Sequence, residues 1–356
     1  MSEELTLISV GRHARLQAVL DYALEGLSPA VLRPDGGPLP PLRGKKLIFA
    51  LSLGVCGIDE SFCRLLMRLR ASEDLLEGSA AVLLVDGEGE LYTKQAAHML
   101  VLAANGAGCA FPGKPLVEGT GSLHNLDVLA GRMKLPNAEV YREAARSLVR
   151  RLLAFAPPRF ERPRVLLLHA SNHATSNTLA LGERAAALLR PACDVEEISL
   201  QNGAIRDCRG CSYKVCSHFA ETGSCFYGGS IVDDVYPALR RCGALLLLCP
   251  NYNDSVSANI MACINRLTSL TVFGGLEDKY LYAVVVSGYS GGDLVAQQVL
   301  GALCLNKALV LPPHFCLTET ANDPGSALRA PGIDARVARF AGRMLGTICT
   351  KPNSSV

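Results

Sequence analysis

The chain lacks several features that define whole classes of protein. It has no tryptophan, only 6% of its 356 residues are aromatic, and its formal net charge at pH 7 is only +2. So small a charge argues against a dedicated nucleic-acid surface. No uninterrupted apolar run approaches the roughly 20 residues that a membrane-spanning helix needs. Hydrophobic residues nevertheless make up 49% of the chain, and a composition rich in Leu, Ala and Val is typical of sheets that are covered by helices.

The beginning of the chain lacks the pattern of a secretion signal, because its first six residues are acidic and polar. We therefore expect a cytoplasmic protein. In that compartment the 14 cysteines are expected to be reduced thiols or metal ligands, and not a disulfide framework. Most of them stand singly in apolar runs, where cysteine behaves as a small hydrophobic residue.

One α/β unit occurs twice in the sequence. Residues 47–69 align without a gap on residues 245–267, and residues 107–120 align on residues 307–320, so the register drifts by only a couple of residues. Polar loops of the second copy have apolar or unrelated counterparts in the first, which predicts one working site and one scaffold. We expect a degenerate domain over residues 1–155, a Pro-rich linker over 156–163 and a ligand-binding domain over 164–356.

Strands alternate with helices in both copies. In the second copy we predict strands over residues 164–169, 195–200, 244–249, 282–287 and 308–311, and helices over 178–189, 257–270, 293–305 and 333–345. The first copy follows the same order, with a weak second strand near Val31. This alternation predicts parallel sheets covered on both faces. Five strands per unit favour two tandem, flavodoxin-like, doubly wound sheets, which is an α/β fold.

Three polar loops follow strands of the second copy, and ligands bind doubly wound sheets outside the carboxyl ends of the strands. The first loop, residues 170–178, is dense in Ser, Thr and Asn at a helix start, which suits either a phosphate monoester or a plain N-cap. The second loop, residues 250–255, contains a Tyr that can stack on a ring, or is a capped turn. Glycines in the third loop, residues 287–293, let backbone approach a planar ligand closely.

With these loops the second copy resembles the NADPH-dependent FMN reductase family of flavodoxin-like proteins. In that family a first loop of the form G-S-x-R-x-x-S holds the FMN phosphate, a P-x-Y segment contacts the isoalloxazine ring, and a Gly-rich segment follows the fourth strand. The resemblance implies FMN as cofactor and NAD(P)H as co-substrate, with His173 in place of the usual Arg. It implies FMN binding by Ser171, His173, Thr175, Ser176, Asn177, Thr178, Pro250, Asn251, Tyr252, Asn253, Ser287, Gly288, Tyr289, Gly291 and Gly292.

A cysteine cluster between the second and third strands of the second copy has no counterpart in the first. Its pattern is C-x2-C-x4-C-x8-C, formed by Cys208, Cys211, Cys216 and Cys225. Four thiolates could hold a [4Fe–4S] cluster, and iron–sulfur flavoproteins related to this family carry a Cys cluster in the corresponding region, usually with a tighter C-x2-C-x2-C core. Zn²⁺ is a second alternative, and a metal-free loop of packed or redox-active thiols is a third.

These patterns predict an FMN-dependent oxidoreductase that passes electrons from NAD(P)H to a small acceptor, such as a quinone, a flavin or a metal centre. No residue is assigned as a general acid or base. The alternative is a non-enzymatic electron carrier or redox sensor. Family members usually dimerise with the flavin near the subunit interface, so the resemblance implies that the two copies form an intramolecular pseudodimer, which could assemble into a further homo-oligomer.

Overall fold

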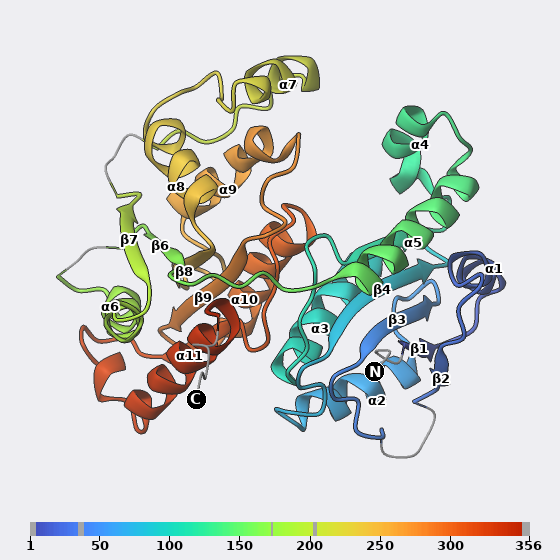
Figure 1. Ribbon diagram of the computed structural model, residues 1–356, viewed down its shortest axis with the longest axis horizontal. Coiled ribbons are helices and arrows are strands. Elements are labelled where there is room, and N and C mark those ends of the chain that lie inside the picture. The colour runs from blue at the N-terminus through green and yellow to red at the C-terminus, as the bar shows by residue number, and fades with distance from the viewer. Residues whose placement is uncertain (1–4, 35–38, 172–173, 202–204, 351–356) are drawn as a thin grey trace, which may run out of the picture. The chain divides into compact units, whose positions relative to one another are not determined.

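The computed structural model describes residues 5–34, 39–171, 174–201 and 205–350. The chain divides into two compact units, Met1–Ala156 and Pro157–Val356. Each unit contains one five-stranded parallel sheet with helices packed against it (Figure 1). No helix in these described ranges is long and apolar enough to cross a membrane. The predicted cytoplasmic location stays a prediction.

The first unit has the strand order β2-β1-β3-β4-β5. The strands of the sheet are β1 (Leu5–Val10), β2 (Ala30–Leu32), β3 (Lys46–Leu53), β4 (Ala80–Gly87) and β5 (Leu116–Gly119). The helices are α1 (Ala14–Ala23), α2 (Glu60–Arg70), α3 (Thr93–Gly106), α4 (Asp127–Met133) and α5 (Asn137–Ala154). Every residue of β3 and β4 is buried, as expected for central strands that are covered on both faces. Helix α1 packs against α5, and α2 packs against α3.

The second unit repeats this winding with the strand order β7-β6-β8-β9-β10. Its strands are β6 (Arg164–His169), β7 (Asp194–Ser199), β8 (Ala244–Pro250), β9 (Tyr280–Ser287) and β10 (Cys316–Thr320). Its helices are α6 (Asn177–Leu189), α7 (Tyr213–Glu221), α8 (Tyr236–Arg241), α9 (Ala258–Thr271), α10 (Gly292–Leu300) and α11 (Ile333–Ile348). This is the flavodoxin-like strand order, so the predicted fold class of two doubly wound parallel sheets is confirmed.

The prediction of the last strand at residues 308–311 is wrong. In that segment Val310 and Leu311 form isolated bridges, Val310 with Tyr280, and the strand that pairs along β9 is β10. Two consecutive prolines, Pro312 and Pro313, separate the two segments. Because proline has no N–H to donate, the ladder cannot run through them. The loop at the carboxyl end of β10 therefore begins at residue 321.

Candidate functional site

A cleft of about 620 Å³ opens at the carboxyl ends of the strands of the second unit. Its volume lies within the range of roughly 300–1,000 Å³ that small-molecule and cofactor sites span. The loops that follow β6 and β8 flank the point where the strand order reverses, which is where this fold binds ligands. The cleft is lined by Thr175, Ser176, Asn177, Thr178, Pro250, Asn251, Tyr252, Asn253, Asp254, Val286, Gly288, Tyr289, Ser290, Ala321 and Asn322.

The first loop leads into the N-terminus of α6. Ser176 caps this helix, because its Oγ accepts a hydrogen bond from the backbone N of Leu179 at 3.0 Å. The side chain of Asn177 bonds to another segment, because its Nδ2 donates to the carbonyl of Asp323 at 2.9 Å. Asn177 therefore fastens a fourth loop, residues 321–327, to the start of the helix. The positive end of the helix macrodipole at this N-terminus suits an anion.

Two polar atoms at the strand ends are buried without a partner. The Oγ of Ser171, a residue that is only 3% exposed, makes no hydrogen bond in the described part of the chain. The Oδ1 of Asn251 is likewise buried without a hydrogen-bond partner among the described residues. A buried polar atom without a hydrogen bond costs about 1–3 kcal/mol, so such atoms are rare unless a ligand or water completes them. Both residues belong to the set that the sequence predicted to bind FMN.

The second loop is a tight two-residue turn. Tyr252 and Ser255 exchange backbone hydrogen bonds of 3.0 and 3.1 Å, and the two residues between them, Asn253 and Asp254, have φ values of 53° and 57°. Asn and Asp tolerate this left-handed conformation, which a type I′ turn requires at both central positions. Gln298 of α10 braces the turn by donating to the carbonyl of Asp254 at 2.9 Å. The turn leaves the ring of Tyr252 largely exposed.

The third loop packs on the second. The Nδ2 of Asn251 lies 3.1 Å from Ser287 Oγ and 3.2 Å from the carbonyl of Ser290. Gly291 has φ 90°, and a Cβ at this position would stand 2.1 Å from Asp254 Oδ1. Glycine adopts this φ without strain and leaves room for the Asp254 carboxylate between the two loops. The third loop also leaves Tyr289 at the surface, 81% exposed.

Residues 163–323 match the model of the NADPH-dependent FMN reductase family. The second unit carries an FMN reductase domain. The resemblance that the three loops predicted is thus confirmed, as is the enzyme class, an NAD(P)H-dependent oxidoreductase, at the level of this family. A search of the curated proteins found no match to the chain.

Several solved structures are similar to about half of the chain. NAD(P)H:quinone oxidoreductase from Methanothermobacter marburgensis is 17% identical, with a TM-score of 0.41, over 54% of this chain and 100% of its own. RosB with a bound riboflavin-phosphate intermediate is 14% identical, with a TM-score of 0.42, over 52% and 80%. An FMN-dependent NADH-azoreductase from Bacillus anthracis in complex with FMN is 9% identical, with a TM-score of 0.35, over 51% and 99%. The assignment rests on the family match and not on these likenesses.

Sequence reasoning placed some site residues well and missed others. Ser171, Ser287, Gly291 and Gly292 do not line the cleft of the FMN reductase domain, although Ser287 and Gly291 shape it through the contacts given above. His173 lies outside the described residues. The predicted set omits the cleft-lining residues Asp254, Val286, Ser290, Ala321 and Asn322. The last two follow β10, and placing that strand after the proline pair would have revealed them.

The corresponding strand ends of the first unit are filled by charged side chains. Asp86, at the end of β4, is 1% exposed and accepts from Arg15 Nε at 2.8 Å and pairs with His13 Nδ1 at 3.1 Å. Arg15 also donates to the carbonyls of Gly87 and Gly121 at 2.9 and 2.8 Å. Arg15 lies in the first turn of α1, so it occupies the helix start that in the FMN reductase domain opens onto the cleft.

The four clustered cysteines line a second cavity, of about 220 Å³, between α7, α9 and the segment that joins β7 to α8. Burial and then the neighbouring thiols, Cys225 first, raise the pKa of Cys216. Arg266 of α9 also lines this cavity, and its buried Nε has no partner in the described residues. Within the same residues no group of three or more His, Cys, Asp or Glu side chains is arranged to hold a metal ion.

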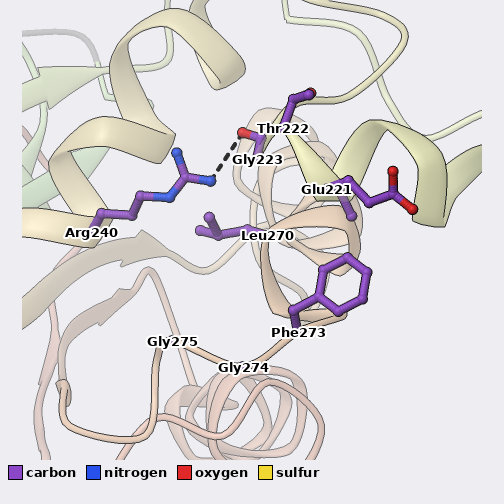
Figure 2. A pocket seen from close by; sticks show the side chains of 9 residues that line it. Glu221, Thr222, Gly223, Arg240, Leu270, Phe273, Gly274 and Gly275 are labelled. Carbon is purple, nitrogen blue, oxygen red and sulfur yellow. Dashed lines mark hydrogen bonds between the residues drawn. The ribbon is translucent and has the colours of Figure 1, made fainter.

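A third cavity, of about 460 Å³, lies where the C-terminal ends of α7 and α9 approach α8. Figure 2 shows the guanidinium of Arg240 directed at the carbonyl of Gly223, to which it donates at 3.1 Å, with the ring of Phe273 across the cavity. The guanidinium of Arg240 is thus already bonded to the backbone. Because no other polar side chain drawn in Figure 2 points into the cavity, we assign the cavity no ligand.

Proposed function

We propose that the FMN reductase domain binds FMN in the cleft at the carboxyl ends of its strands and passes electrons from NAD(P)H to a small acceptor. The observation that carries this proposal is the convergence of the three predicted loops on one cleft, beside the two unpartnered buried atoms of Ser171 and Asn251. When bound, FMN would take a hydride from NAD(P)H and give two electrons to the acceptor.

We assign the two ends of the cleft to the two ends of the cofactor. Ser171, Thr175, Ser176 and Thr178 would hold the phosphate together with the backbone N–H groups at the start of α6, and the sequence motif adds His173 to this set. Pro250, Asn251, Tyr252 and Asn253 would contact the ring, and Gly288 and Tyr289 its other edge. Asn177, Ser287, Gly291 and Gly292 would act by shaping these loops, since the side chain of Asn177 bonds the fourth loop and Ser287 holds Asn251.

The acceptor that we propose is a planar aromatic molecule such as a quinone or a free flavin. Two exposed rings, Tyr252 and Tyr289, stand at the cleft on neighbouring loops. Offset stacking on such rings favours planar conjugated partners. A metal centre, the other acceptor class that the sequence suggested, would not be stabilised by stacking on these rings.

The test uses the full chain, purified under anaerobic conditions. FMN binding is measured by quenching of flavin fluorescence, and oxidation of NADH and NADPH is followed with and without a small benzoquinone. We expect one FMN per chain and turnover that requires the quinone. A protein that is colourless and leaves the fluorescence of added FMN unchanged would refute the proposal.

A second candidate, a one-electron carrier or sensor that contains a metal centre, is favoured by the cavity that all four clustered cysteines line. The buried Arg266 in its wall would stabilise an anionic group such as a thiolate-bound cluster. Iron, sulfide and zinc analysis of the anaerobic protein separates the alternatives. About four irons per chain support [4Fe–4S], one zinc supports a tetrahedral site, and neither metal supports a loop of free thiols.

We further propose that the two units arose by duplication of one domain, with a boundary in the Pro-rich segment 156–163, and that they form a pseudodimer. In support, both sheets wind in the same order, and β4 (80–87) and β9 (280–287) differ by 200 at both ends. The mass of the assembly in solution and the number of FMN molecules per chain test this. Two FMN molecules per chain would contradict a degenerate first unit.

A further inference from the structure

The amide of Asn251 is held where the second and third loops meet, and only one of its two ends has partners. Its Nδ2 lies 3.1 Å from Ser287 Oγ, 3.2 Å from the carbonyl of Ser290 and 3.3 Å from Asp254 Oδ1. A carbonyl and a carboxylate accept hydrogen bonds and do not donate them, so the nitrogen of the amide faces them. These contacts leave Oδ1 as a buried acceptor without a partner in the described part of the chain.

The main chain also holds Asn251 in place. Its backbone N donates to the carbonyl of Val286 at 2.9 Å, and Val286 is the residue of β9 in register with Pro250. Asn251 lines the cleft, and the two loops that its side chain joins are the ones that we assign to the flavin ring. Because both its backbone and its Nδ2 are bonded, Asn251 cannot turn Oδ1 toward another partner without losing these contacts.

We propose that Asn251 Oδ1 accepts a hydrogen bond from the imide N3–H of the flavin ring and so selects a flavin for the cleft. This inference rests on the proposed function. The oxidised isoalloxazine ring has a single N–H, at N3, and the other nitrogens and oxygens along its polar edge accept hydrogen bonds. An acceptor beside the ring can therefore bond the ring only through N3. The oxygens of a quinone also accept, so the same atom disfavours a quinone in the position of the flavin.

The test replaces the N3 hydrogen of the cofactor by a methyl group. 3-Methyl-FMN keeps the phosphate, the ribityl hydroxyls and every acceptor of the ring, so it differs from FMN only at the proposed bond. Fluorescence titration without NAD(P)H gives the dissociation constants of both flavins for the wild-type chain, Asn251→Ala and Ser287→Ala. Ser287→Ala is the matched control, because it removes one contact of Nδ2 and keeps Oδ1.

We expect the wild-type chain to bind 3-methyl-FMN about tenfold more weakly than FMN, because the methyl group removes the donor and leaves a buried acceptor unpaired. Asn251→Ala should bind FMN more weakly than wild type and should bind the two flavins within about threefold of each other. Ser287→Ala should retain a preference for FMN of about tenfold, because its Oδ1 acceptor is still present.

Equal affinities of the wild-type chain for the two flavins would overturn the inference and would mean that a ribityl hydroxyl or a water completes Oδ1. A preference for FMN that persists undiminished in Asn251→Ala would overturn it as well, because N3–H would then have another acceptor. Asn251→Leu, which is similar to asparagine in volume, takes the place of Asn251→Ala if the smaller side chain leaves the protein unfolded. A wild-type chain that binds neither flavin would instead refute the proposed function.

Discussion

At the scale of single residues, the hydroxyl of Ser171 contributes no hydrogen bond to the described fold. Its Oγ is buried without a partner among the described residues, so we predict that Ser171→Ala leaves the free energy of unfolding unchanged or slightly raised. If the hydroxyl bonds the phosphate, the same variant should bind FMN about tenfold more weakly. Urea unfolding without ligand and FMN titration measure the two effects separately.

Ser217 of α7 provides the matched control for this variant. Its Oγ is also buried without a partner in the described part of the chain, but it belongs to α7 and not to a loop at a strand end. Ser217→Ala should therefore change stability in the same direction and leave FMN affinity as it is. A Ser171→Ala protein with wild-type affinity would remove Ser171 from the phosphate site.

Gly291 lets the third loop pack closely on the second loop because it has no side chain. We predict that Gly291→Ala weakens FMN binding about tenfold, because the new methyl would displace the side chains of Asp254 and Asn251, and Asn251 is the residue that bonds the two loops. Gly332→Ala is the control, since Gly332 also has a positive φ, of 67°, but has no atom within 4 Å of the added Cβ. Fluorescence titration decides, and equal affinities of the two variants would show that the collision is relieved elsewhere.

At the scale of elements, the start of α1 and the end of β4 are held together by one buried carboxylate. Removing Asp86 would leave Arg15 without its carboxylate partner, while His13 would keep its contact with Glu88. We predict that Asp86→Ala lowers the free energy of unfolding of the first unit by about 2–3 kcal/mol, less than the 3–5 typical of a fully buried pair because Arg15 is partly exposed.

Glu88 supplies the comparison for Asp86, because it contacts the same His13 from a position that is 55% exposed. Glu88→Ala should cost no more than about 1 kcal/mol. Urea unfolding of the full chain, followed by hydrogen exchange of peptides from residues 5–154, measures both variants. Equal losses would mean that burial of Asp86 does not set the strength of this contact.

The elements themselves could be predicted well from sequence where a strand is covered on both faces. For example, β8 (Ala244–Pro250) could be predicted from composition alone, because it is a continuous apolar run. The edge strand β10 was missed, because only two of its five residues, Cys316 and Leu317, are apolar, and a more apolar segment, residues 308–311, lay just before it. Periodicity follows burial, so it predicts central strands better than edge strands.

At the scale of the whole molecule, the alignment of the two copies predicted two sheets of the same winding, but not what fills each site. Three loops of the cleft could be predicted because ligand-binding residues follow strand ends as a rule. The pairing of Arg15 with Asp86 joins residues 71 positions apart, and the shared cavity of the four cysteines depends on how α7 packs on α9. Contacts between distant segments leave no local pattern in the sequence.

The buried thiols are concentrated in the second unit, which predicts how stability of the whole chain changes with alkali. Burial raises the pKa of Cys242 to about 11 and those of Cys263 and Cys316 to about 12. A thiol whose pKa is raised by folding contributes stability that is complete below its unfolded pKa of about 9 and is lost as the pH rises toward the folded value. In the first unit, the described thiol with a raised pKa is Cys109.

We therefore predict constant stability between pH 7 and 8 and a loss on the order of 1 kcal/mol per buried thiol at pH 10. Urea unfolding of the full chain in the presence of reductant measures the loss. Hydrogen exchange at pH 10 should show that peptides from residues 164–348 lose protection at lower urea than those from residues 5–154. Cys263→Ala should flatten the pH dependence while lowering stability at pH 7, because it leaves a cavity but no titrating group. Equal alkaline losses in the two units would mean that the buried tyrosines, which both units contain, and not the thiols, set this dependence.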